Sequence, residues 1–265
     1  MKVTVFTSNQ TRHLHFIKRL QEVTNDLHVV METLSVFPGK VQDFYNKSEP
    51  MQRYFSRVLE AEEKVFATKD HSLSNINLIP LRSGDLNHMS KEQFGTALDA
   101  DLFIVFGGSW IRGWLIDFLM SKRTVNIHMG MSPWYRGAAC NFWACKDGNP
   151  QYVGATLHLL AKGLDTGGML YHVRPEPKLY SDSFEFTMAS VRSAHEVIFE
   201  KIQDGSLLSV PPVEQDKRQE IRYTRNSEFT DEIALDWLEN EPKPEEIRDA
   251  LLDADAEEFV RLHLR

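Results

Sequence analysis

Short apolar segments of strand length alternate with longer segments of helical spacing along most of the chain, and this alternation limits the possible folds more than any other feature. The strand-like segments are Lys2–Thr7, Leu27–Met31, Ile76–Pro80, Asp101–Phe106, Thr124–His128, Val153–Leu160 and Met169–Val173. The helix-like segments are Thr11–Val23, Glu49–Phe66, Ala138–Cys145 and Ser183–Asp204, and Ser90 is expected to cap a helix that runs to about Leu98. This pattern predicts an α/β domain with a mostly parallel sheet and helices on both faces.

The pattern weakens after Pro211-Pro212, so we expect two parts in the chain. The first is the α/β domain, over residues 1–205, and the second is a small, mainly helical extension, over residues 206–265. Within the extension we expect a short strand at Glu220–Tyr223 and helices at Thr230–Leu238 and Pro244–Leu264.

Charge is unevenly distributed between these two parts. The whole chain has a formal net charge of −8, but Ser227–Arg265 alone contains 13 acidic and 4 basic residues. The remainder is therefore close to neutral. Because nucleic-acid binding depends on clustered Lys and Arg side chains, nucleic acid is not an expected partner. The acidic helices could form a homodimer interface or cover the sheet.

Cysteine content and hydropathy indicate where in the cell the protein is expected. The two cysteines, Cys140 and Cys145, are too few for a disulfide framework or a zinc site and are expected to be free thiols. Lys2–Phe6 is typical of a strand and not of a signal peptide, and no apolar run reaches the 18 residues of a membrane span. We therefore expect a cytoplasmic protein with no membrane partner.

Two polar side chains lie at the end of one predicted strand, at Asn126 and His128. Alternate side chains of a strand face the same way, so both are expected on one side. The carboxyl end of a parallel strand borders the crevice in which open α/β sheets bind ligands. An Asn-x-His pair is common, however, and is weak evidence by itself.

An acidic residue, Asp165, lies in a second informative stretch, the glycine-flanked segment Gly163–Gly168 between two predicted strands. A lone Asp in a glycine turn is usually only a turn residue. If it lies beside a histidine, however, it can orient the ring and favour its protonated form.

Taken in order, these stretches resemble the folate-dependent formyltransferases. The resemblance rests on Asn126-Ile127-His128, then Ser132-Pro133-Trp134-Tyr135-Arg136-Gly137-Ala138-Ala139, then Gly163-Leu164-Asp165-Thr166-Gly167. The close match covers about Asp99 to His172, and the order of elements matches over 1–205. The family includes glycinamide ribonucleotide, methionyl-tRNA and sugar N-formyltransferases. The chain departs from it at Met129–Pro133, where the family usually has Pro-Ser-Leu-Leu-Pro, and at Gly107–Ile111, where it has a Gly-Leu-Ile-like loop.

The resemblance implies a formyltransferase-type Rossmann-like fold, 10-formyltetrahydrofolate as co-substrate, no metal, and Asn126, His128 and Asp165 as catalytic residues. The chemistry agrees with this assignment. When an amine attacks the formyl carbon, an oxyanion forms and needs hydrogen-bond donors, which the Asn126 amide and a His128 N–H can supply. The attacking nitrogen becomes cationic, and Asp165 can accept its proton directly or through a water molecule.

The resemblance also implies where the two substrates bind. The folate is expected between the loop after Phe106 and the Gly163–Gly168 loop, on residues Phe106, Gly107, Trp110, Ile111, Gly163, Leu164 and Asp165, with Ile104 offering further apolar surface. The expected acceptor ligands are Gln10, Ser132, Tyr135 and Arg136. Arg136 could equally be a structural ion-pair partner. Ser8–Gln10 and Phe37–Phe66 are expected to help select the acceptor.

Other polar residues have simpler interpretations. His13 and His15 are expected to be ordinary residues near the start of a helix, and His158 a histidine packed into a strand. Cys140 is expected to be a helix residue near the site and not a nucleophile.

Four functions fit the sequence. The first is formylation of the primary amine of a small molecule, above all an amino group of a nucleotide-linked sugar. The alternatives are formylation of methionyl-tRNA, hydrolysis of formyltetrahydrofolate, and a catalytically idle folate-binding scaffold. The acidic, helical tail counts against the tRNA alternative, because that enzyme usually carries a basic C-terminal β-barrel.

Overall fold

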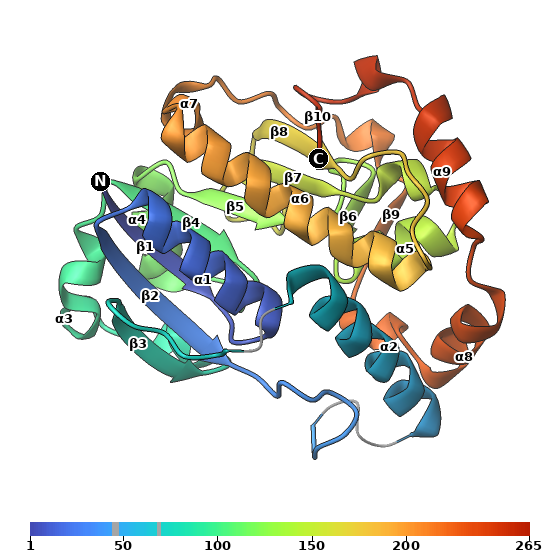
Figure 1. The fold of residues 1–265 in the computed structure, drawn as a ribbon. Helices are drawn as coiled ribbons and strands as arrows, with labels where there is room; N and C mark the ends of the chain where they lie inside the picture. Colours follow the sequence, from blue (N-terminus) through green and yellow to red (C-terminus); the bar gives the residue numbers. More distant parts are fainter. Residues whose placement is uncertain (44–47, 68–69) are drawn as a thin grey trace.

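A computed structural model describes residues 1–43, 48–67 and 70–265 (Figure 1). The described residues form an eight-stranded sheet in the order β10-β8-β7-β5-β4-β1-β2-β3 and a two-stranded sheet of β6 and β9. The main sheet is parallel except that β7 runs antiparallel to both of its neighbours. The strands are β1 Lys2–Thr7, β2 Asp26–Thr33, β3 Asn77–Arg82, β4 Leu102–Phe106, β5 Val125–His128, β6 Tyr135–Gly137, β7 Ala155–Leu159, β8 Met169–Arg174, β9 Arg222–Thr224 and β10 His263–Leu264.

Helices cover both faces of the main sheet, which agrees with the predicted fold class (Figure 1). They are α1 Thr11–Val23, α2 Glu49–Phe66, α3 Lys91–Phe94, α4 Gly113–Ser121, α5 Cys140–Lys146, α6 Ser183–Gln203, α7 Ser206–Ser209, α8 Asp231–Asn240 and α9 Pro244–Asp253. Strand alternation separates two cores. Val5 and Ile104 pack with α1 and α6, whereas Phe6, Phe103 and Val105 pack with α3 and α4.

Local sequence signals set several element boundaries. Helices α1 and α2 have the bounds that their apolar spacing predicts. The Ser48 side chain accepts a hydrogen bond from the Met51 N–H at the start of α2, and Ser90 and Gln93 form a capping box at the start of α3. The expected helix from Ser90 to Leu98 ends earlier, at Phe94, and continues as a 3-10 turn over Gly95–Leu98.

Two elements differ from the expectation. Helix α4 has no predicted counterpart because Gly113–Ser121 is apolar on nearly every side and lacks a helical alternation of polar and apolar residues. The helix expected over Pro244–Leu264 ends at Asp253. Beyond it the chain forms a 3-10 helix over Ala256–Glu258, and β10 then pairs with β8 at the edge of the sheet, so backbone pairing to a distant strand overrides the local helical spacing.

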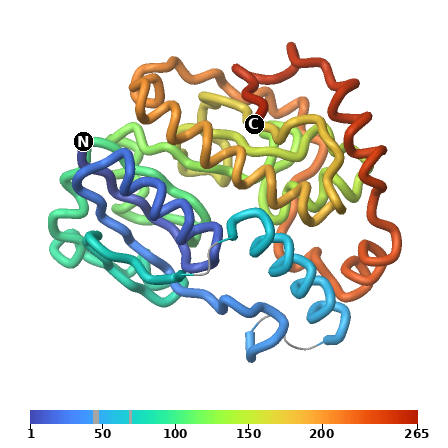
Figure 2. Tube along the Cα trace, in the orientation of Figure 1, coloured from blue at the N-terminus to red at the C-terminus, as the bar shows by residue number. Residues whose placement is uncertain are grey.

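The C-terminal segment folds back over the α/β domain instead of projecting from it (Figure 2). Val213 forms an isolated antiparallel bridge with Met169, and β9 pairs in parallel with β6, so that Tyr135 lies beside Arg222. The loop expected after His128 therefore contains a short strand whose partner lies far along the chain. Among the described residues, no helix is both long and apolar enough to cross a membrane.

One buried histidine links this segment to the loop after β5. The Nδ1 atom of His172 accepts a hydrogen bond from the Val260 N–H at 3.0 Å, and its Nε2–H donates to the Ser132 carbonyl at 2.8 Å. The bond from Val260 requires the neutral ring, because a protonated Nδ1 cannot accept it, whereas the bond to Ser132 can form in either state. Burial lowers the pKa of His172 to about 4, although the bond to Ser132 opposes this shift.

We expect this histidine to make the folded state less stable in acid. Between its unfolded pKa of 6.5 and its folded pKa of about 4, the unfolded chain binds a proton that the folded chain does not, so the free energy of unfolding falls as pH falls through this range. His172→Gln should cost about 1–2 kcal/mol at pH 7.5, because buried hydrogen bonds are lost, but should reduce the slope of stability with pH. Urea unfolding from pH 7.5 to 4.5 measures both, with the exposed His88→Gln as control. An unchanged slope in His172→Gln would contradict the assignment.

Candidate active site

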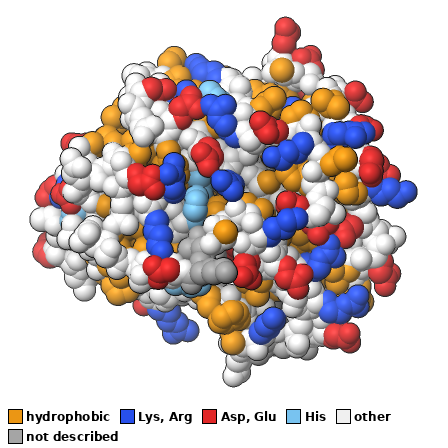
Figure 3. All heavy atoms as spheres, in the orientation of Figure 1, with side chains coloured by type: hydrophobic (Ala, Val, Ile, Leu, Met, Phe, Trp, Pro, Cys, Tyr) orange, Lys and Arg blue, Asp and Glu red, His pale blue; other side chains and the backbone are white. Residues whose placement is uncertain are grey.

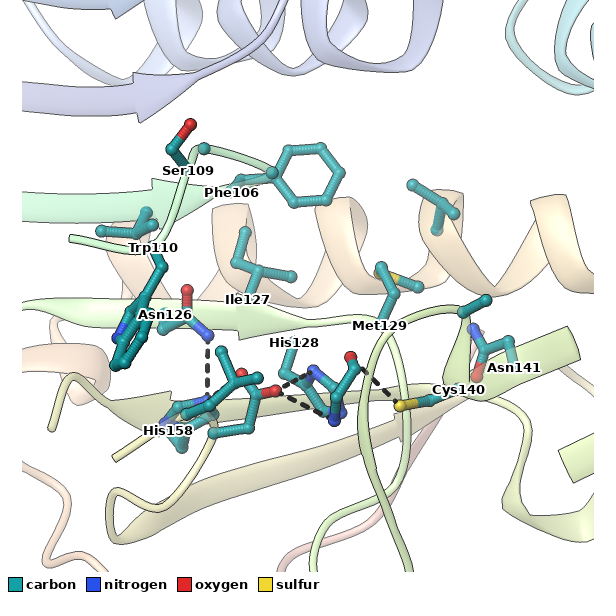
Figure 4. A pocket seen from close by; sticks show the side chains of 18 of the residues that line it. Phe106, Ser109, Trp110, Asn126, Ile127, His128, Met129, Cys140, Asn141 and His158 are labelled. Atoms are coloured by element: carbon teal, nitrogen blue, oxygen red, sulfur yellow. Dashed lines mark hydrogen bonds and ion pairs between the residues drawn. The ribbon is translucent and has the colours of Figure 1, made fainter. Parts of the chain in front are cut away.

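A cavity of 490 Å³ opens at the carboxyl ends of the central parallel strands (Figure 4). Strand β4 ends at Phe106 and β5 ends at His128, and both residues line the cavity. Parallel strands direct their carboxyl ends toward one edge, which is where open α/β sheets bind ligands. All three residues predicted to be catalytic, Asn126, His128 and Asp165, line this cavity.

His128 and Asp165 are brought together although 36 residues separate them in the numbering. The His128 Nδ1 atom lies 3.3 Å from Asp165 Oδ2, and both side chains are less than a tenth exposed. The His128 Nε2 atom lies 3.1 Å from the carbonyl oxygen of Tyr135. Both ring nitrogens therefore face oxygen acceptors, an arrangement that can hold a proton on each. Burial lowers the pKa of His128, and the charge of Asp165 opposes this shift.

Asp165 is held as a carboxylate in an unusual backbone conformation. Its φ of 51° lies in the left-handed region, which non-glycine residues seldom adopt and which costs about 1–3 kcal/mol. Burial alone would raise its pKa, but the His128 and His158 rings and the Gly137 N–H lower the pKa of Asp165 to about 2. The carboxylate is therefore ionised over the whole physiological pH range and available to accept a proton.

His158, which was expected to be a packed histidine only, completes this group. Its Nε2 atom lies 2.9 Å from Asn126 Nδ2 and 3.8 Å from Asp165 Oδ1 (Figure 4). Its Nδ1 atom lies 2.8 Å from the carbonyl oxygen of Leu159, so Nδ1–H donates there and Nε2 accepts from Asn126. Strands β5 and β7 pair antiparallel with Asn126 opposite His158. That register is the signal that could have identified His158, and it depends on knowing the pairing.

The predicted folate residues form one wall of the cavity. Phe106, Gly107, Trp110, Ile111, Gly163 and Leu164 all line it, and Trp110 is 58% exposed at the opening. Ile104 does not line it, because its side chain faces the core under α1 and α6. Gly107 has a φ of 72°, and a Cβ atom there would lie 2.3 Å from the His13 ring. His13, expected to be an ordinary helix residue, thus packs against this wall, with its ring stacked on Phe106.

A buried carboxylate fixes the loop that carries Trp110. Glu32, at the end of β2, is 3% exposed and accepts hydrogen bonds from the Gly84 N–H at 2.7 Å and the Ser109 N–H at 2.5 Å. It therefore joins the loops that follow β3 and β4. Nothing in the sequence around Glu32 indicated this contact.

The four residues expected to bind the acceptor all lie outside the cavity lining. Ser132 is fully buried, and Tyr135 is buried with its hydroxyl bonded to Asp147 and Asn149. Arg136 forms an ion pair with Glu220 at 2.7 Å and donates to the Leu164 carbonyl, so it supports the site from behind. Gln10 lies at the N-cap of α1.

Other residues form the end of the cavity away from Trp110. Tyr54 and Val58 of α2 lie there with Phe142 of α5, so part of the Phe37–Phe66 segment does border the site, while residues 44–47 are outside the described residues. Among the described lining residues, Arg12 is the sole Lys or Arg. Its guanidinium is paired with the buried Glu62 carboxylate, which accepts a hydrogen bond from the Arg12 side chain at 2.9 Å and another from the Arg12 backbone N–H at 2.8 Å. This end is therefore apolar and nearly neutral.

Cys140 also lines the cavity, where its thiol lies 3.4 Å from the Gly137 carbonyl oxygen. Burial raises its pKa well above the ordinary value, so the protonated thiol is favoured and the residue is a poor nucleophile. Within the described ranges, no group of three His, Cys, Asp or Glu side chains has the arrangement of a metal site.

The fold and this site match known proteins of one family. The sequence profile of the formyl transferase family matches residues 1–202, and the chain therefore belongs to that family. A methionyl-tRNA formyltransferase from Synechococcus sp. (strain JA-2-3B'a(2-13)) is 30% identical over 118 residues, which are 43% of this chain and 36% of that protein. The chain thus matches little more than a third of that relative's length.

Solved structures agree in fold. A 4-N formyltransferase from Francisella tularensis matches with a TM-score of 0.52 and 16% identity, over 100% of this chain and 98% of that one. An N-formyltransferase from Helicobacter canadensis, solved with folinic acid and dTDP-3-aminofucose, matches with a TM-score of 0.50 and 11% identity, over 99% and 84% of the two chains. At these identities the likeness concerns the fold alone.

The contact between His158 and Asn126 gives a test of the site. In His158→Ala the Asn126 amide loses its acceptor and can rotate, so we expect turnover to fall about tenfold, the effect of about 1.4 kcal/mol lost from a hydrogen bond that orients a reacting group. Steady-state kinetics measures the effect. His28→Ala is the control, because His28 is a buried histidine of β2 that does not line the cavity. Equal losses in both variants would show that the effect is not local.

Proposed function

We propose that the protein transfers a formyl group from 10-formyltetrahydrofolate to the primary amine of a small molecule, above all an amino group of a nucleotide-linked sugar. The observation that carries this proposal is the meeting of Asn126, His128 and Asp165 in one cavity, with the Asp165 carboxylate 3.3 Å from the imidazole. Family membership supports the reaction class.

The reaction can be written with these residues. The amine attacks the formyl carbon, and the carbonyl oxygen becomes an oxyanion. Asn126 Nδ2 has a second N–H beyond the one bonded to His158, and this N–H can donate to the developing charge. A His128 N–H is the second donor, once it turns from its present oxygen acceptor toward the substrate. Asp165 accepts the proton of the attacking nitrogen. The oxyanion then re-forms the carbonyl as the bond from the formyl carbon to N10 of the folate breaks. N10 takes the proton that Asp165 had accepted, directly or through a water molecule, so that tetrahydrofolate forms and Asp165 returns to the carboxylate.

The two ends of the cavity suit the two substrates. The wall of Phe106, Trp110 and Leu164 offers apolar surface for a flat pterin. The opposite end, with Tyr54, Val58 and Phe142, offers apolar surface for a sugar ring and its methyl or methylene groups. Arg12 forms an ion pair with Glu62, so its charge is already neutralised. Within the part of the chain that the structure describes, this end therefore offers no free cation to phosphate groups, and the phosphates of a nucleotide sugar would lie outside it.

The distribution of charge on the protein surface supports a small acceptor. Lys and Arg side chains are interspersed with Asp and Glu on the face shown in Figure 3, with no single basic surface there. Transfer RNA would need such a surface to hold its phosphates. The N-formyltransferase from Helicobacter canadensis, which has the same fold, was solved with the amino sugar nucleotide dTDP-3-aminofucose, and this also supports a sugar acceptor.

The assay for this proposal follows tetrahydrofolate release from 10-formyltetrahydrofolate. We expect release with dTDP-3-aminofucose or a related amino sugar nucleotide and none without an amine. Release without any amine would indicate a hydrolase, and release only with methionyl-tRNA would indicate the tRNA enzyme. Folate binding without turnover in any arm would indicate the idle scaffold.

Changes at the predicted catalytic residues test their roles. Asp165→Asn and His128→Ala should each lower turnover about a hundred- to a thousandfold, because one removes the proton acceptor and the other a donor to the oxyanion. Asp117→Asn is the control, since Asp117 is exposed and pairs with the exposed Lys162. Near-normal turnover in Asp165→Asn or His128→Ala, with circular dichroism showing a folded protein, would refute the assigned roles.

Filling the apolar end tests the acceptor site separately. Val58→Phe should raise the acceptor KM about tenfold or more, since overpacking costs about 1–3 kcal/mol and 1.4 kcal/mol is tenfold in binding. Its effect on folate affinity, measured by isothermal titration calorimetry, should be small. Val41→Phe, at a 43% exposed position, is the control. A selective loss of folate affinity in Val58→Phe would place the acceptor elsewhere.

A further inference from the structure

A stretch of the C-terminal extension, residues 213–224, lies against the loops that carry the catalytic residues. We name it the strap. It begins at the bridge between Val213 and Met169 and ends in β9, which pairs with β6 (Figure 1). The match to the family profile ends at residue 202, so the strap lies outside the matched residues.

Gln215 makes the most direct contact between the strap and the site. Its Nε2 atom donates to the carbonyl oxygens of Asp165 and Gly167, each at 2.8 Å. A carboxamide has two N–H donors, and here both hold the same loop. The two carbonyls flank Thr166 and belong to the segment in which Asp165 has its φ of 51°. The Gln215 side chain therefore holds the backbone in the conformation that directs the Asp165 carboxylate toward His128.

A second contact from the strap reinforces the same loop through another residue. Glu220 pairs with Arg136 at 2.7 Å, and the other terminal nitrogen of Arg136 donates to the Leu164 carbonyl at 2.8 Å. Thr224 of β9 accepts from Ala138 N–H at 3.0 Å through its carbonyl. The strap thus holds Leu164, Asp165 and Gly167 from one side and the β6 segment from the other.

We propose that the strap positions Asp165 for catalysis, with Gln215 as the positioning residue. The inference rests on the proposed role of Asp165 in formyl transfer. Gln215 does not line the cavity and touches no reacting atom. Its effect passes through the backbone of the Asp165 loop, so the catalytic group of this chain is complete only when the extension is docked.

The experiment compares three variants of the full chain. Gln215→Ala removes both donors, and Gln215→Glu keeps the shape but replaces the donors with carboxylate oxygens that face two carbonyls. Gln219→Ala is the matched control, because Gln219 is exposed on the same strap and its side chain bonds to neither loop. Four quantities are measured: kcat, KM, hydrogen–deuterium exchange of residues 163–168, and Tm.

We expect Gln215→Ala and Gln215→Glu to lower kcat about 10- to 100-fold, since a misplaced catalytic group costs this much. Exchange in residues 163–168 should rise in both variants while Tm stays near that of the parent. Lowering the pH should restore part of the activity of Gln215→Glu relative to the parent at the same pH, because a protonated carboxyl can donate one hydrogen bond. A role in packing alone would produce no such recovery.

Unchanged exchange at 163–168 in Gln215→Ala would overturn the proposal, as would a kcat loss matched by Gln219→Ala. Because exchange does not depend on turnover, this test remains valid if the acceptor is a different amine. Full activity in Asp165→Asn together with increased exchange in Gln215→Ala would refute the proposed function while leaving the strap's hold on the loop intact.

Discussion

The contact between the Asp165 carboxylate and the His128 imidazole is the interaction on which the rest of the site depends. Two buried groups that can carry charge are stable together only if each compensates the desolvation of the other and nearby dipoles satisfy what remains. Here the remaining partners are the Tyr135 carbonyl, the Gly137 N–H and the His158 ring. The low pKa of Asp165 follows from these surroundings and keeps its carboxyl group ionised at neutral pH.

His128 and Asp165 are held in place by different parts of the chain. His128 and Asn126 are fixed by the end of β5, which is paired in parallel with β4 and antiparallel with β7 and so has little room to move. Asp165 is on a connection between β7 and β8 and adopts a left-handed backbone conformation, which costs free energy. The strap and Arg136 supply the hydrogen bonds that hold it. Rigidity on one side of the cavity is thus inherent in the sheet, whereas on the other side it comes from packing of the extension.

Much of the fold could be predicted because its signals are local. The apolar spacing of α1 and α2 and the caps at Ser48 and Ser90 are encoded within a few residues of each element. Helix α4 was missed because an apolar segment without alternation does not reveal its period. The end of α9 and the strands β6 and β10 were missed because each depends on a partner strand remote in the chain, and pairing of that kind leaves no local pattern.

The site also has features that can be read locally in the sequence and features that depend on contacts between distant segments. The order of Asn126, His128 and Asp165, with the motifs and glycines beside them, was enough to predict the reaction class through the resemblance to formyltransferases, because these motifs can be read from the sequence alone. Folding decided the partners of these groups: His158 through the register of β7, Gln215 through the course of the strap, and the burial of Ser132 and Tyr135 away from the cavity. Chemical identity is carried by each residue alone, whereas distance and burial arise only when segments far apart in the chain pack together.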